Sequence, residues 1–352
     1  GYDVHCLDSN PEAPMIEGCT SHYGTESPLE KVDLLVVSPG VPSSNPIIVK
    51  AEQLGITVSG ELGFAASHIS APLLAVTGTN GKSSTAWYTH QLLEQAGYRS
   101  FVGGNFGTAL SEMAMDEDKF DVGVVEVSSY QMEFPHGFNP HAAVALNLTP
   151  DHLKRHGTMD VYAEMKRRVF AEQGSNQFSI VSVGETELYP KNNAWKWWIG
   201  RHPGALVNNG AVDLSTAYGD HRLSLKSLQL LGKHNQQNIV AACLLVHSLQ
   251  TDLSQLSLRT LQPLEHRLER VKDQDGVTWI NDSKATNIEA TMAGIAGVGG
   301  QQIVLLGGAG KEGADYKRLL PLLKKYARAV ICFGQSGDEI GLQIHNNGFD
   351  VH

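Results

Sequence analysis

A lysine and two hydroxyl side chains follow a glycine-rich turn near residue 80, and together they could hold a phosphate group. The turn comes directly after the apolar run 73–77 and directly before 84–95, which has helical spacing. Glycine lets the backbone turn tightly and approach oxygen atoms, and the N–H groups at a helix N-terminus face an anion. A lysine here reaches the β and γ phosphates, and the serine after it can ligate Mg²⁺. The residues that we expect to bind the nucleotide are Gly78, Thr79, Asn80, Gly81, Lys82, Ser83 and Ser84.

This loop does not match the common phosphate-binding loop in full. The common pattern has a glycine five residues before Gly81, where this chain has Val76. A Gly-Lys-Ser triplet alone is frequent by chance, but a strand before it and a helix after it make the signal specific. We therefore predict an ATP site with Lys82 as a catalytic residue, rather than a tight structural turn.

Three polar side chains stand where a strand or a turn ends, and each could bind a metal ion or a phosphate. Glu126 lies near the end of the apolar run 122–127, where a lone carboxylate is costly unless it is paired or binds a metal. His152 comes shortly after the run 143–148, and Asn105 lies in a glycine-rich turn. We expect Glu126 and His152 to bind Mg²⁺. The alternatives are a salt-bridged glutamate, a structural histidine and a plain turn asparagine.

Short apolar runs alternate along the chain with segments of helical spacing. The runs are continuous in Val, Ile and Leu, as in strands buried on both faces of a parallel sheet. This alternation predicts an α/β fold with doubly wound sheets. The predicted strands are 33–38, 73–77, 122–127, 143–148, 178–183, 278–280, 303–306 and 329–333, and the predicted helices are 84–95, 160–172 and 316–326.

Three blocks organise these elements: 1–69, 70–262 and 263–352. The middle block begins with the strand before the phosphate loop, and the third begins near Pro263. Region 187–222 has weak periodicity, and we expect a surface excursion or a small β segment of the middle block there. Its cluster of tryptophans is expected to pack under a loop rather than to bind a ligand.

Composition and charge exclude several classes of protein. The 352 residues are too many for one ordinary domain, and 41% hydrophobic with 18% charged residues is typical of globular proteins. A net charge of −10 argues against nucleic-acid binding. The chain has no apolar run of about 18 residues and no signal-peptide pattern. We therefore expect a cytoplasmic protein without membrane contact.

The four cysteines and the two chain ends carry further expectations. Cys6, Cys19, Cys243 and Cys332 are scattered, and none is part of a Cys-x-x-Cys motif, so neither a zinc knuckle nor a redox pair is predicted. We expect small buried hydrophobic residues in a reducing cytosol. The chain begins without methionine and ends in a strand-like sequence, so we expect both ends to be cuts through a longer protein.

Several motifs follow the phosphate loop in a fixed order. They are Gly-Gly-Asn-Phe-Gly (103–107), Glu-Val-Ser-Ser-Tyr-Gln (126–131), Asn-Leu-Thr-Pro-Asp-His-Leu (147–153), Gly-Lys-His-Asn-Gln-Gln-Asn (232–238) and Glu-His-Arg-Leu-Glu (265–269). Together with the loop they resemble the Mur ligase family, the ATP-dependent amino-acid ligases of peptidoglycan assembly, which includes the folylpolyglutamate synthetases. Lys166, four residues after Tyr162, stands where this family carries a carbamylated lysine.

Two later motifs resemble the members of the family that add D-glutamate. They are Asn-Asp-Ser-Lys-Ala-Thr-Asn (281–287) and Leu-Leu-Gly-Gly-Ala-Gly-Lys (305–311). The resemblance implies a ligase that joins D-glutamate to UDP-N-acetylmuramoyl-L-alanine through an acyl phosphate, in cytoplasmic peptidoglycan precursor synthesis. The implied cofactors are ATP and two Mg²⁺ ions, with a CO₂-derived carbamate on Lys166. We expect a monomer whose partners are these small molecules.

The fold that the resemblance implies is α/β with three domains. Block 1–69 would be a Rossmann-like domain for the UDP-linked substrate, incomplete at its N-terminus. Block 70–262 would be a P-loop-type domain that binds ATP. Block 263–352 would be a Rossmann-like domain for the amino acid, incomplete at its C-terminus.

The resemblance also implies roles for residues outside the loop. Glu126, His152 and carbamylated Lys166 would be catalytic and would bind Mg²⁺ with Ser83. The remaining nucleotide ligands would be Asn235, Asn238, Arg267 and Asp282. The substrate ligands would be Asn105, Ser128, Ser129, Gln131, Lys284, Thr286 and Lys311. Capping of a helix by Asn235 is an equally good interpretation of that residue.

Two other functions stay open on the sequence alone. Another amino-acid ligase of the same family, such as a folate or tripeptide ligase, would lack the motif at 281–287. A nucleotide-binding switch or a non-catalytic relative would need none of Lys82, Glu126, His152 and Lys166, all of which are present. The motifs therefore favour the D-glutamate ligase.

Overall fold

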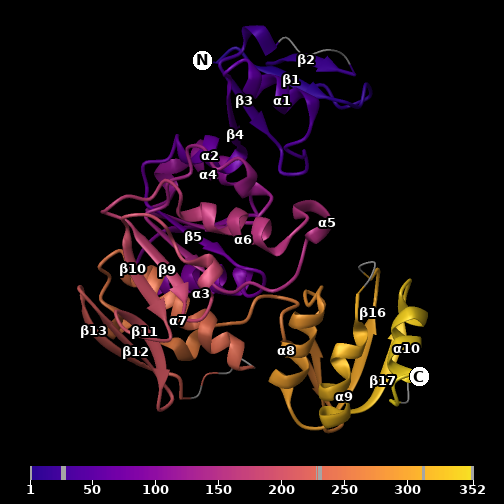
Figure 1. Cartoon of the computed structure of the whole chain (residues 1–352). Coiled ribbons are helices and arrows are strands. Elements are labelled where there is room, and N and C mark those ends of the chain that lie inside the picture. Colours follow the sequence, from indigo (N-terminus) through magenta and orange to yellow (C-terminus); the bar gives the residue numbers. More distant parts are fainter. Residues whose placement is uncertain (1, 25–28, 227, 229–231, 311–313, 350–352) are drawn as a thin grey trace.

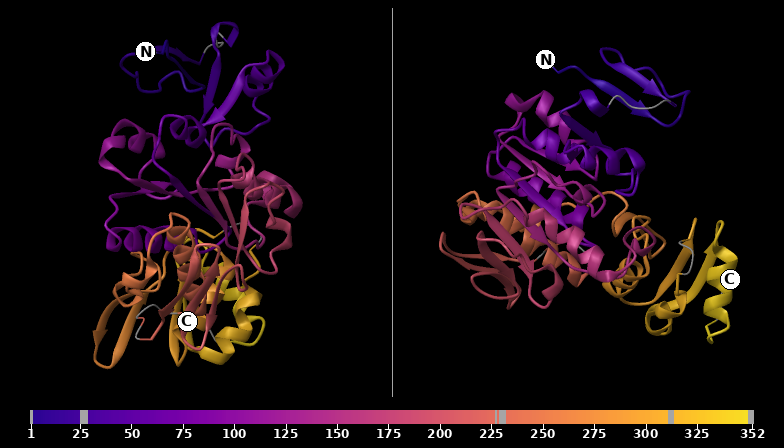
Figure 2. Two further views of the ribbon diagram at one scale, coloured as in Figure 1. Left: turned by 90° about the vertical axis from the view of Figure 1, so that its left-hand side faces the viewer. Right: turned by 45° about the horizontal axis from the view of Figure 1, so that its top comes forward.

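A large central sheet separates the N-terminal and C-terminal parts of the molecule (Figure 1). The computed structural model describes residues 2–24, 29–226, 228, 232–310 and 314–349. Within these residues a nine-stranded sheet is accompanied by two two-stranded sheets on its N-terminal side and two on its C-terminal side. Figure 2 shows that the N-terminal and C-terminal parts lie on different sides of the central part. No helix in the described ranges has the length and apolar character needed to cross a membrane.

Two small parallel sheets form the N-terminal part. β1 pairs with β2, and β3 pairs with β4. Asn45 begins α1 by accepting a hydrogen bond from the backbone N–H of Ile47, and Pro46 suits the first turn because it has no N–H to satisfy. The elements are β1 (His5–Asp8), β2 (Thr20–Tyr23), η1 (Leu29–Lys31), β3 (Leu34–Val37), α1 (Pro46–Gln53), β4 (Thr57–Gly60) and α2 (Glu61–Ala66).

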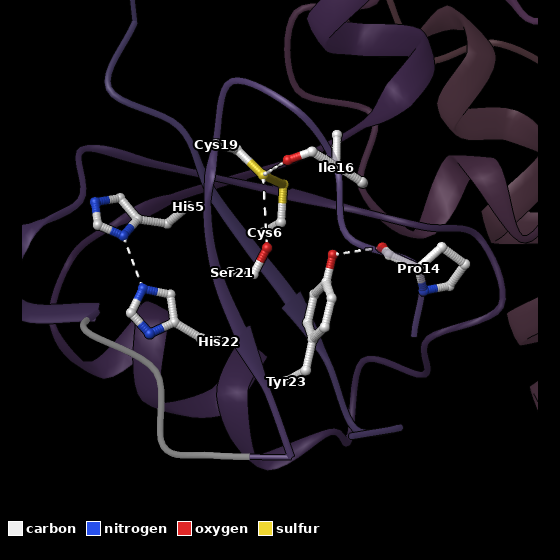
Figure 3. Close-up of a disulfide and its surroundings, with 8 residues drawn as sticks. All are labelled: His5, Cys6, Pro14, Ile16, Cys19, Ser21, His22 and Tyr23. Carbon is white, nitrogen blue, oxygen red and sulfur yellow. Dashed lines mark hydrogen bonds between the residues drawn. A yellow bond between two sulfur atoms is a disulfide. The ribbon is translucent and has the colours of Figure 1, made fainter. Parts of the chain in front are cut away.

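Cys6 and Cys19 form a disulfide in this part (Figure 3). The prediction that the cysteines are unpaired is therefore wrong for this pair. β1 and β2 align Cys6 opposite Ser21, which brings the residue preceding β2 to a Cα–Cα distance of 6.3 Å from Cys6. That distance is within the usual range for a disulfide, and strand pairing across 13 residues leaves no local motif in the sequence. Cys243 is buried as expected, whereas Cys332 is half-buried.

The central sheet has the strand order β13-β12-β11-β10-β9-β8-β5-β7-β6. Strands β6 to β11 and β5 pair in parallel, and β12 and β13 are antiparallel additions at one edge. The strands are β5 (Leu73–Thr77), β6 (Ser100–Gly104), β7 (Val122–Glu126), β8 (Ala142–Ala145), β9 (Phe178–Ser182), β10 (Trp195–Ile199), β11 (Gly204–Asn208), β12 (Ala211–Thr216) and β13 (Gly219–Ser224).

Helices cover both faces of this sheet, which explains its continuous apolar strands. Leu74 and Val76 of β5 pack in one core with α3 and α7, whereas Leu73 and Ala75 pack in a second core with α2 and α4. Every residue of β5 is buried, so both faces of the strand must be apolar. The helices are α3 (Lys82–Gln95), α4 (Leu110–Met115), η2 (Glu117–Lys119), η3 (Gln131–Glu133), α5 (Leu153–His156), α6 (Met159–Arg167), η4 (Arg168–Phe170), η5 (Thr186–Leu188), α7 (Lys233–His247), η6 (Leu253–Gln255) and η7 (Leu258–Thr260).

Region 187–222 extends the central sheet, so the expected β segment of the middle block is confirmed and the alternative of a surface excursion is wrong. β10 pairs in parallel with β9 along its whole length, and β11 to β13 continue the sheet from there. Trp197 of β10 is only 2% exposed and packs on Phe178 at a ring-centroid distance of 4.5 Å. The expected packing role of the tryptophans is confirmed for this residue, but it lies in a strand rather than under a loop.

The C-terminal part contains an antiparallel hairpin and a parallel strand pair. β14 pairs antiparallel with β15, and β16 pairs in parallel with β17. Pro321 divides the predicted helix 316–326 into a 3₁₀ turn and a short helix. The elements are β14 (Glu269–Gln274), β15 (Val277–Asn281), α8 (Ile288–Val298), β16 (Gln302–Gly307), η8 (Tyr316–Leu319), α9 (Leu320–Tyr326), β17 (Ala327–Phe333) and α10 (Gly337–His345).

The prediction of strands buried on both faces fails outside the central sheet. β3 and β16 alternate between more and less exposed residues, and the hairpin is largely exposed. In β16, Ile303 is 59% and Leu305 is 55% exposed. A continuous apolar run marks a strand, but its sequence cannot tell whether one or two faces will be covered. The predicted α/β class is confirmed.

Candidate functional site

The ends of three neighbouring strands bring the predicted nucleotide residues to one edge of the central sheet. β5 lies between β7 and β8 and pairs in parallel with both. From β5 the chain passes through α3 to β6 on one side, and from β7 it crosses to β8 on the other. Open α/β sheets bind ligands at such a switch in strand order, beyond the carboxyl ends of the strands. The phosphate loop follows β5, Glu126 ends β7, and residue 147 comes two residues after β8.

The loop itself has the backbone of an anion site. Gly78 and Gly81 have φ values of 147° and 88°, which other residues rarely adopt. Asn147 holds the loop from outside: its Oδ1 accepts from the N–H of Asn80 at 2.9 Å, and its Nδ2 donates to the carbonyl of Asn80 at 3.0 Å. α3 begins at Lys82, and no side chain caps the N-terminus of this helix. The backbone N–H groups in the first turn of α3 are therefore suited to bind an anion.

Replacing Gly81 by alanine is expected to disable the loop. A Cβ atom at Gly81 would collide with Oδ1 of Asn238, in addition to the strain of a positive φ. Gly97, beyond the other end of α3, also has a φ of 88° but nothing within 4 Å of a Cβ. G97A should lower the free energy of unfolding by about 1–2 kcal/mol and leave ATP affinity unchanged. G81A should also weaken ATP binding by on the order of tenfold or more. Calorimetric titration with ATP measures the difference, and equal affinities in the two variants would contradict it.

Two lysines converge on one carbonyl of the loop. Lys82 Nζ donates to the carbonyls of Gly78 at 3.0 Å and Thr79 at 2.8 Å, and Lys166 Nζ donates to that of Gly78 at 2.6 Å. Lys166 is 1% exposed, so it is not a surface lysine. Burial, reinforced by the nearby Lys82, holds the pKa of Lys166 well below the usual lysine range. A neutral amine can react with CO₂, whereas an ammonium cannot.

Glu126 is a buried carboxylate with one oxygen that nothing satisfies. The residue is 3% exposed, and its Oε1 accepts from Asn105 Nδ2 at 2.8 Å. Its Oε2 is buried and has no hydrogen-bond partner among the described residues. A carboxylate in this situation is costly unless a cation compensates it. Glu126 therefore fits a metal ligand, and the amide of Asn105 orients it.

No protein cage for a metal exists in the described ranges. No three His, Cys, Asp or Glu side chains converge there on a point that could hold an ion. Mg²⁺ keeps several waters and usually takes one or two carboxylates together with substrate phosphates. The ligand set of the site therefore fits Mg²⁺ bound with ATP better than an ion held by protein alone.

His152 lies on the exposed side of this region, in a left-handed backbone conformation with a φ of 56°. Its Nδ1 lies 3.1 Å from the hydroxyl of Tyr130, and its Nε2 lies 3.6 Å from Asp151. The side chain of His152 is 38% exposed. It lines an open cleft together with Tyr130 and residues of the C-terminal part. Its role as a magnesium ligand stays a prediction.

The predicted substrate residues after β7 form a tight local network. Ser128 binds Gln131 Oε1 through both its N–H and its hydroxyl, at 2.9 Å each. Ser129 is 2% exposed, and its hydroxyl lies 2.9 Å from Nε2 of His156. The network fixes the turn that carries these side chains next to Glu126.

The C-terminal part reaches the phosphate loop directly. Asn287 Nδ2 donates to Asn80 Oδ1 at 3.0 Å, while Oδ1 of Asn287 caps α8 by accepting from the N–H of Ala290. Lys284 Nζ lies 4.7 Å from the centre of the Phe106 ring, in the turn that carries Asn105. Two residues of the motif at 281–287 thus contact the central part.

The other predicted residues of this part lie at or near the same contact. Arg267 Nη1 donates to the carbonyl of Lys284 at 3.2 Å, and its Nε is buried without a partner among the described residues. Asp282 accepts from the N–H of Leu268, and burial raises its pKa. Thr286 lines the open cleft. Lys311 lies outside the described residues.

Asn235 and Asn238 lie inside the molecule rather than on an open surface. Asn235 is 1% exposed, and its Oδ1 accepts from the hydroxyl of Tyr88 at 3.2 Å and from Nδ2 of Asn238 at 3.3 Å. Gly232, not Asn235, is the residue that caps α7, so the capping interpretation is wrong. Asn238 packs on Gly81, which joins α7 to the phosphate loop.

Sequence reasoning assigned no role to several residues that shape the site. Asn147 holds the loop, Asn287 connects α8 to it, and Tyr162 lies beside Thr79 at an O–O distance of 3.2 Å. Asn147 and Asn287 stand inside the quoted motifs, so the motifs contained the signal. His156 carries no such signal, because it stands outside the quoted motifs, three residues after Leu153.

Two family models match the chain. The Mur ligase middle domain matches residues 76–246, and the Mur ligase, glutamate ligase domain matches residues 266–352. The chain therefore belongs to the Mur ligase family, and it is an ATP-dependent ligase that forms amide bonds. The family expected from the motifs is confirmed.

Relatives and solved structures agree with this assignment. Proteins named UDP-N-acetylmuramoylalanine--D-glutamate ligase include one from Legionella pneumophila (strain Paris), 34% identical over 89% of this chain and 72% of its own length. Another, from Pelotomaculum thermopropionicum, is 36% identical over 91% and 72%. MurF from Acinetobacter baumannii shares the fold with a TM-score of 0.65 at 18% identity, over 83% of this chain and 69% of its own. Folylpolyglutamate synthase from Mycobacterium tuberculosis, solved with ADP and AMPPCP, has a TM-score of 0.63 at 16% identity, over 86% and 84%.

Proposed function

We propose that this protein uses ATP to join D-glutamate to UDP-N-acetylmuramoyl-L-alanine, as a cytoplasmic step of peptidoglycan precursor synthesis. The observation that carries the proposal is the convergence of Lys82, Lys166 and the buried Glu126 at the switch in strand order of the central sheet. The names of the relatives and the motif at 281–287 support D-glutamate as the amino acid.

The chemistry explains why these residue types are needed. A carboxylate is a poor electrophile, so its oxygen first takes the γ-phosphoryl group of ATP, ADP leaves, and an acyl phosphate forms. The neutral amine of D-glutamate then attacks the carbonyl carbon, phosphate leaves with the bonding electron pair, and the nitrogen loses a proton. Both steps bring anions together, so cationic groups must balance the charge. Lys82 would bind the β and γ phosphates, and Arg267 would bind the γ-phosphate from the C-terminal part.

Metal binding would centre on Glu126. Its unsatisfied Oε2 would hold one Mg²⁺ with the hydroxyl of Ser83, and His152 and Lys166 would hold a second. When bound, these ions would neutralise phosphate charge. Lys166 would serve as a carbamate: its nitrogen attacks CO₂, a proton leaves the nitrogen, and the product carries an anionic oxygen donor. Its burial and lowered pKa support this modification.

Each part of the chain would bind one substrate. Residues 1–69 would bind the UDP group, 70–262 would bind ATP, and 263–352 would bind D-glutamate through Lys284, Thr286 and Lys311. Asn235, Asn238 and Asp282 would enclose the nucleoside, and Asn105, Ser128, Ser129 and Gln131 would contact the muramoyl peptide. Asn287 and Lys284 contact the central part, which supports a reaction between substrates bound by residues 70–262 and by residues 263–352.

Phosphate release tests the proposal. The protein is supplied with ATP, Mg²⁺ and UDP-N-acetylmuramoyl-L-alanine, and D-glutamate, L-glutamate, L-lysine or meso-diaminopimelate is added in turn. Release that depends on D-glutamate alone is the expected result. Release with a different amino acid would keep the ligase class and overturn the specificity. Tight ATP binding without release would favour a non-catalytic relative.

A further inference from the structure

A column of stacked rings crosses the site between residues 130 and 166. The ring of Tyr130 stacks on His156, and His156 stacks on Tyr162, each with centroids 5.4 Å apart and interplanar angles of 29° and 23°. The guanidinium of Arg155 lies over Tyr130 at 5.3 Å, and Lys166 Nζ lies over Tyr162 at 4.5 Å. We call Tyr130, His156 and Tyr162 the ring column. Because a basic side chain lies at each end, the column connects Arg155 with Lys166.

Both ends of the ring column are anchored. Arg155 forms a two-point ion pair with Glu133 and donates to the carbonyls of Gly40 at 3.2 Å and Val41 at 2.9 Å, in the N-terminal part. Lys166 donates to the carbonyl of Gly78 in the phosphate loop. A shift of any ring would therefore disturb a contact at one of these ends.

His156 is the central ring and the only histidine of the column. It is 7% exposed, and its Nε2 lies 2.9 Å from the hydroxyl of Ser129. Burial lowers the pKa of His156, which favours the neutral form of the ring. The side chain thus does two things: its nitrogen fixes the hydroxyl of Ser129, and its face supports the ring over which Lys166 lies.

We propose that His156 is a positioning residue of the ligase site, which sets Ser129 through a hydrogen bond and Lys166 through the ring of Tyr162. The inference rests on the proposed function, in which Ser129 contacts the UDP-linked substrate and Lys166 carries the carbamate. His156 acts through these neighbours and touches no reacting group. The two actions can be separated by substitution. A phenyl ring keeps the stacking without the hydrogen bond, and an amide side chain keeps the hydrogen bond without the stacking.

Two substitutions separate the actions. H156F keeps the stacking and loses the hydrogen bond, so the KM for UDP-N-acetylmuramoyl-L-alanine should rise about fivefold with kcat nearly unchanged. H156Q keeps an amide that reaches Ser129 and loses the ring. The bicarbonate concentration for half-maximal activity should then rise about fivefold, and the carbamate signal of protein incubated with ¹³C-bicarbonate should weaken. The KM for the UDP-linked substrate should stay unchanged in H156Q.

His141→Phe is the matched control. His141 is also part-buried: it binds the carbonyl of Ser248 through Nε2 at 3.0 Å, and its ring packs on Phe178. This substitution therefore removes a comparable hydrogen bond away from the site, and it should change neither KM nor bicarbonate dependence. Variants at His156 that behave like H141F overturn the proposal. Equal changes of both parameters in H156F and H156Q, as a merely structural role would give, also overturn it.

Ser129→Ala tests the hydrogen bond without changing His156. It should raise the KM for the UDP-linked substrate at least as much as H156F does, because it also removes the hydroxyl that contacts the substrate. Adding H156F to S129A should give no further rise, because His156 acts on this KM through Ser129. Additive effects would overturn the proposal. If the wild-type protein does not ligate D-glutamate, the proposed function fails, while the carbamate signal of H156Q against wild type still decides whether His156 positions Lys166.

Discussion

Glu126→Gln is expected to lower kcat by on the order of 10³-fold while leaving the protein folded. The substitution keeps the size of the side chain and an oxygen for Asn105, but it removes the charge from a carboxylate whose Oε2 has no partner among the described residues. Because burying a charge without compensation is costly, the melting temperature without nucleotide should stay the same or rise. Phosphate release at a series of Mg²⁺ concentrations, with thermal unfolding beside it, measures both effects.

Glu185→Gln provides the comparison for this result. Glu185 is a part-buried carboxylate just beyond the end of β9 in the same sheet, and it accepts from the N–H of Leu148 at 3.0 Å. Glutamine can still accept that bond, so kcat should stay within about twofold of wild type. If E126Q keeps the wild-type kcat and instead lowers the melting temperature, Glu126 is a structural residue and the metal assignment fails.

Lys166→Met should abolish ligation, with a loss on the order of 10³-fold in kcat. Methionine fills the same buried space but cannot form a carbamate. Wild-type protein should show a ¹³C carbamate signal after incubation with labelled bicarbonate, and its rate should fall when CO₂ is removed and recover when bicarbonate returns. The variant should show neither the signal nor the bicarbonate dependence.

Lys196→Met is the matched substitution for Lys166. Nζ of Lys196 also donates to one backbone carbonyl, that of Asn192 at 2.9 Å, but on the exposed surface of β10. Its loss should leave both the rate and the carbamate signal unchanged. A wild-type rate that is independent of CO₂ would show that Lys166 acts as an amine, for example by binding the Gly78 carbonyl and the phosphates.

The local sequence pattern was sufficient to predict the phosphate loop and the elements on either side of it. Strand 73–77 was predicted with its observed bounds, and the helix after the loop was predicted with its observed end, although α3 begins at Lys82, two residues before the predicted start. This works because the strand, the turn and the helix are consecutive in the sequence. The spacing of apolar residues indicates the strand and the helix, and the glycines indicate the turn. Glu126 was predictable for the same reason, as a carboxylate at the end of an apolar run.

Contacts between distant segments were not predictable from local pattern. Nothing in the sequence shows that Lys166 and Lys82 share the carbonyl of Gly78, or that Cys6 faces Cys19 across a strand pair. For region 187–222 the sequence left a surface excursion and a small β segment both open, because weak periodicity does not reveal that β10 adds to β9. Strand order and register decide these contacts, and they depend on the packing of the whole sheet.

The sequence by itself determined the class of chemistry: a phosphate loop, a buried carboxylate and a family of ATP-dependent ligases. The tertiary structure decided how these residues act together. It placed Asn287 on the phosphate loop, and it placed His156 between the rings of Tyr130 and Tyr162, the second of which lies next to Lys166 Nζ. The physical reason is that residue type and spacing specify what a side chain can do, whereas its partners, burial and pKa depend on which remote segments pack against it.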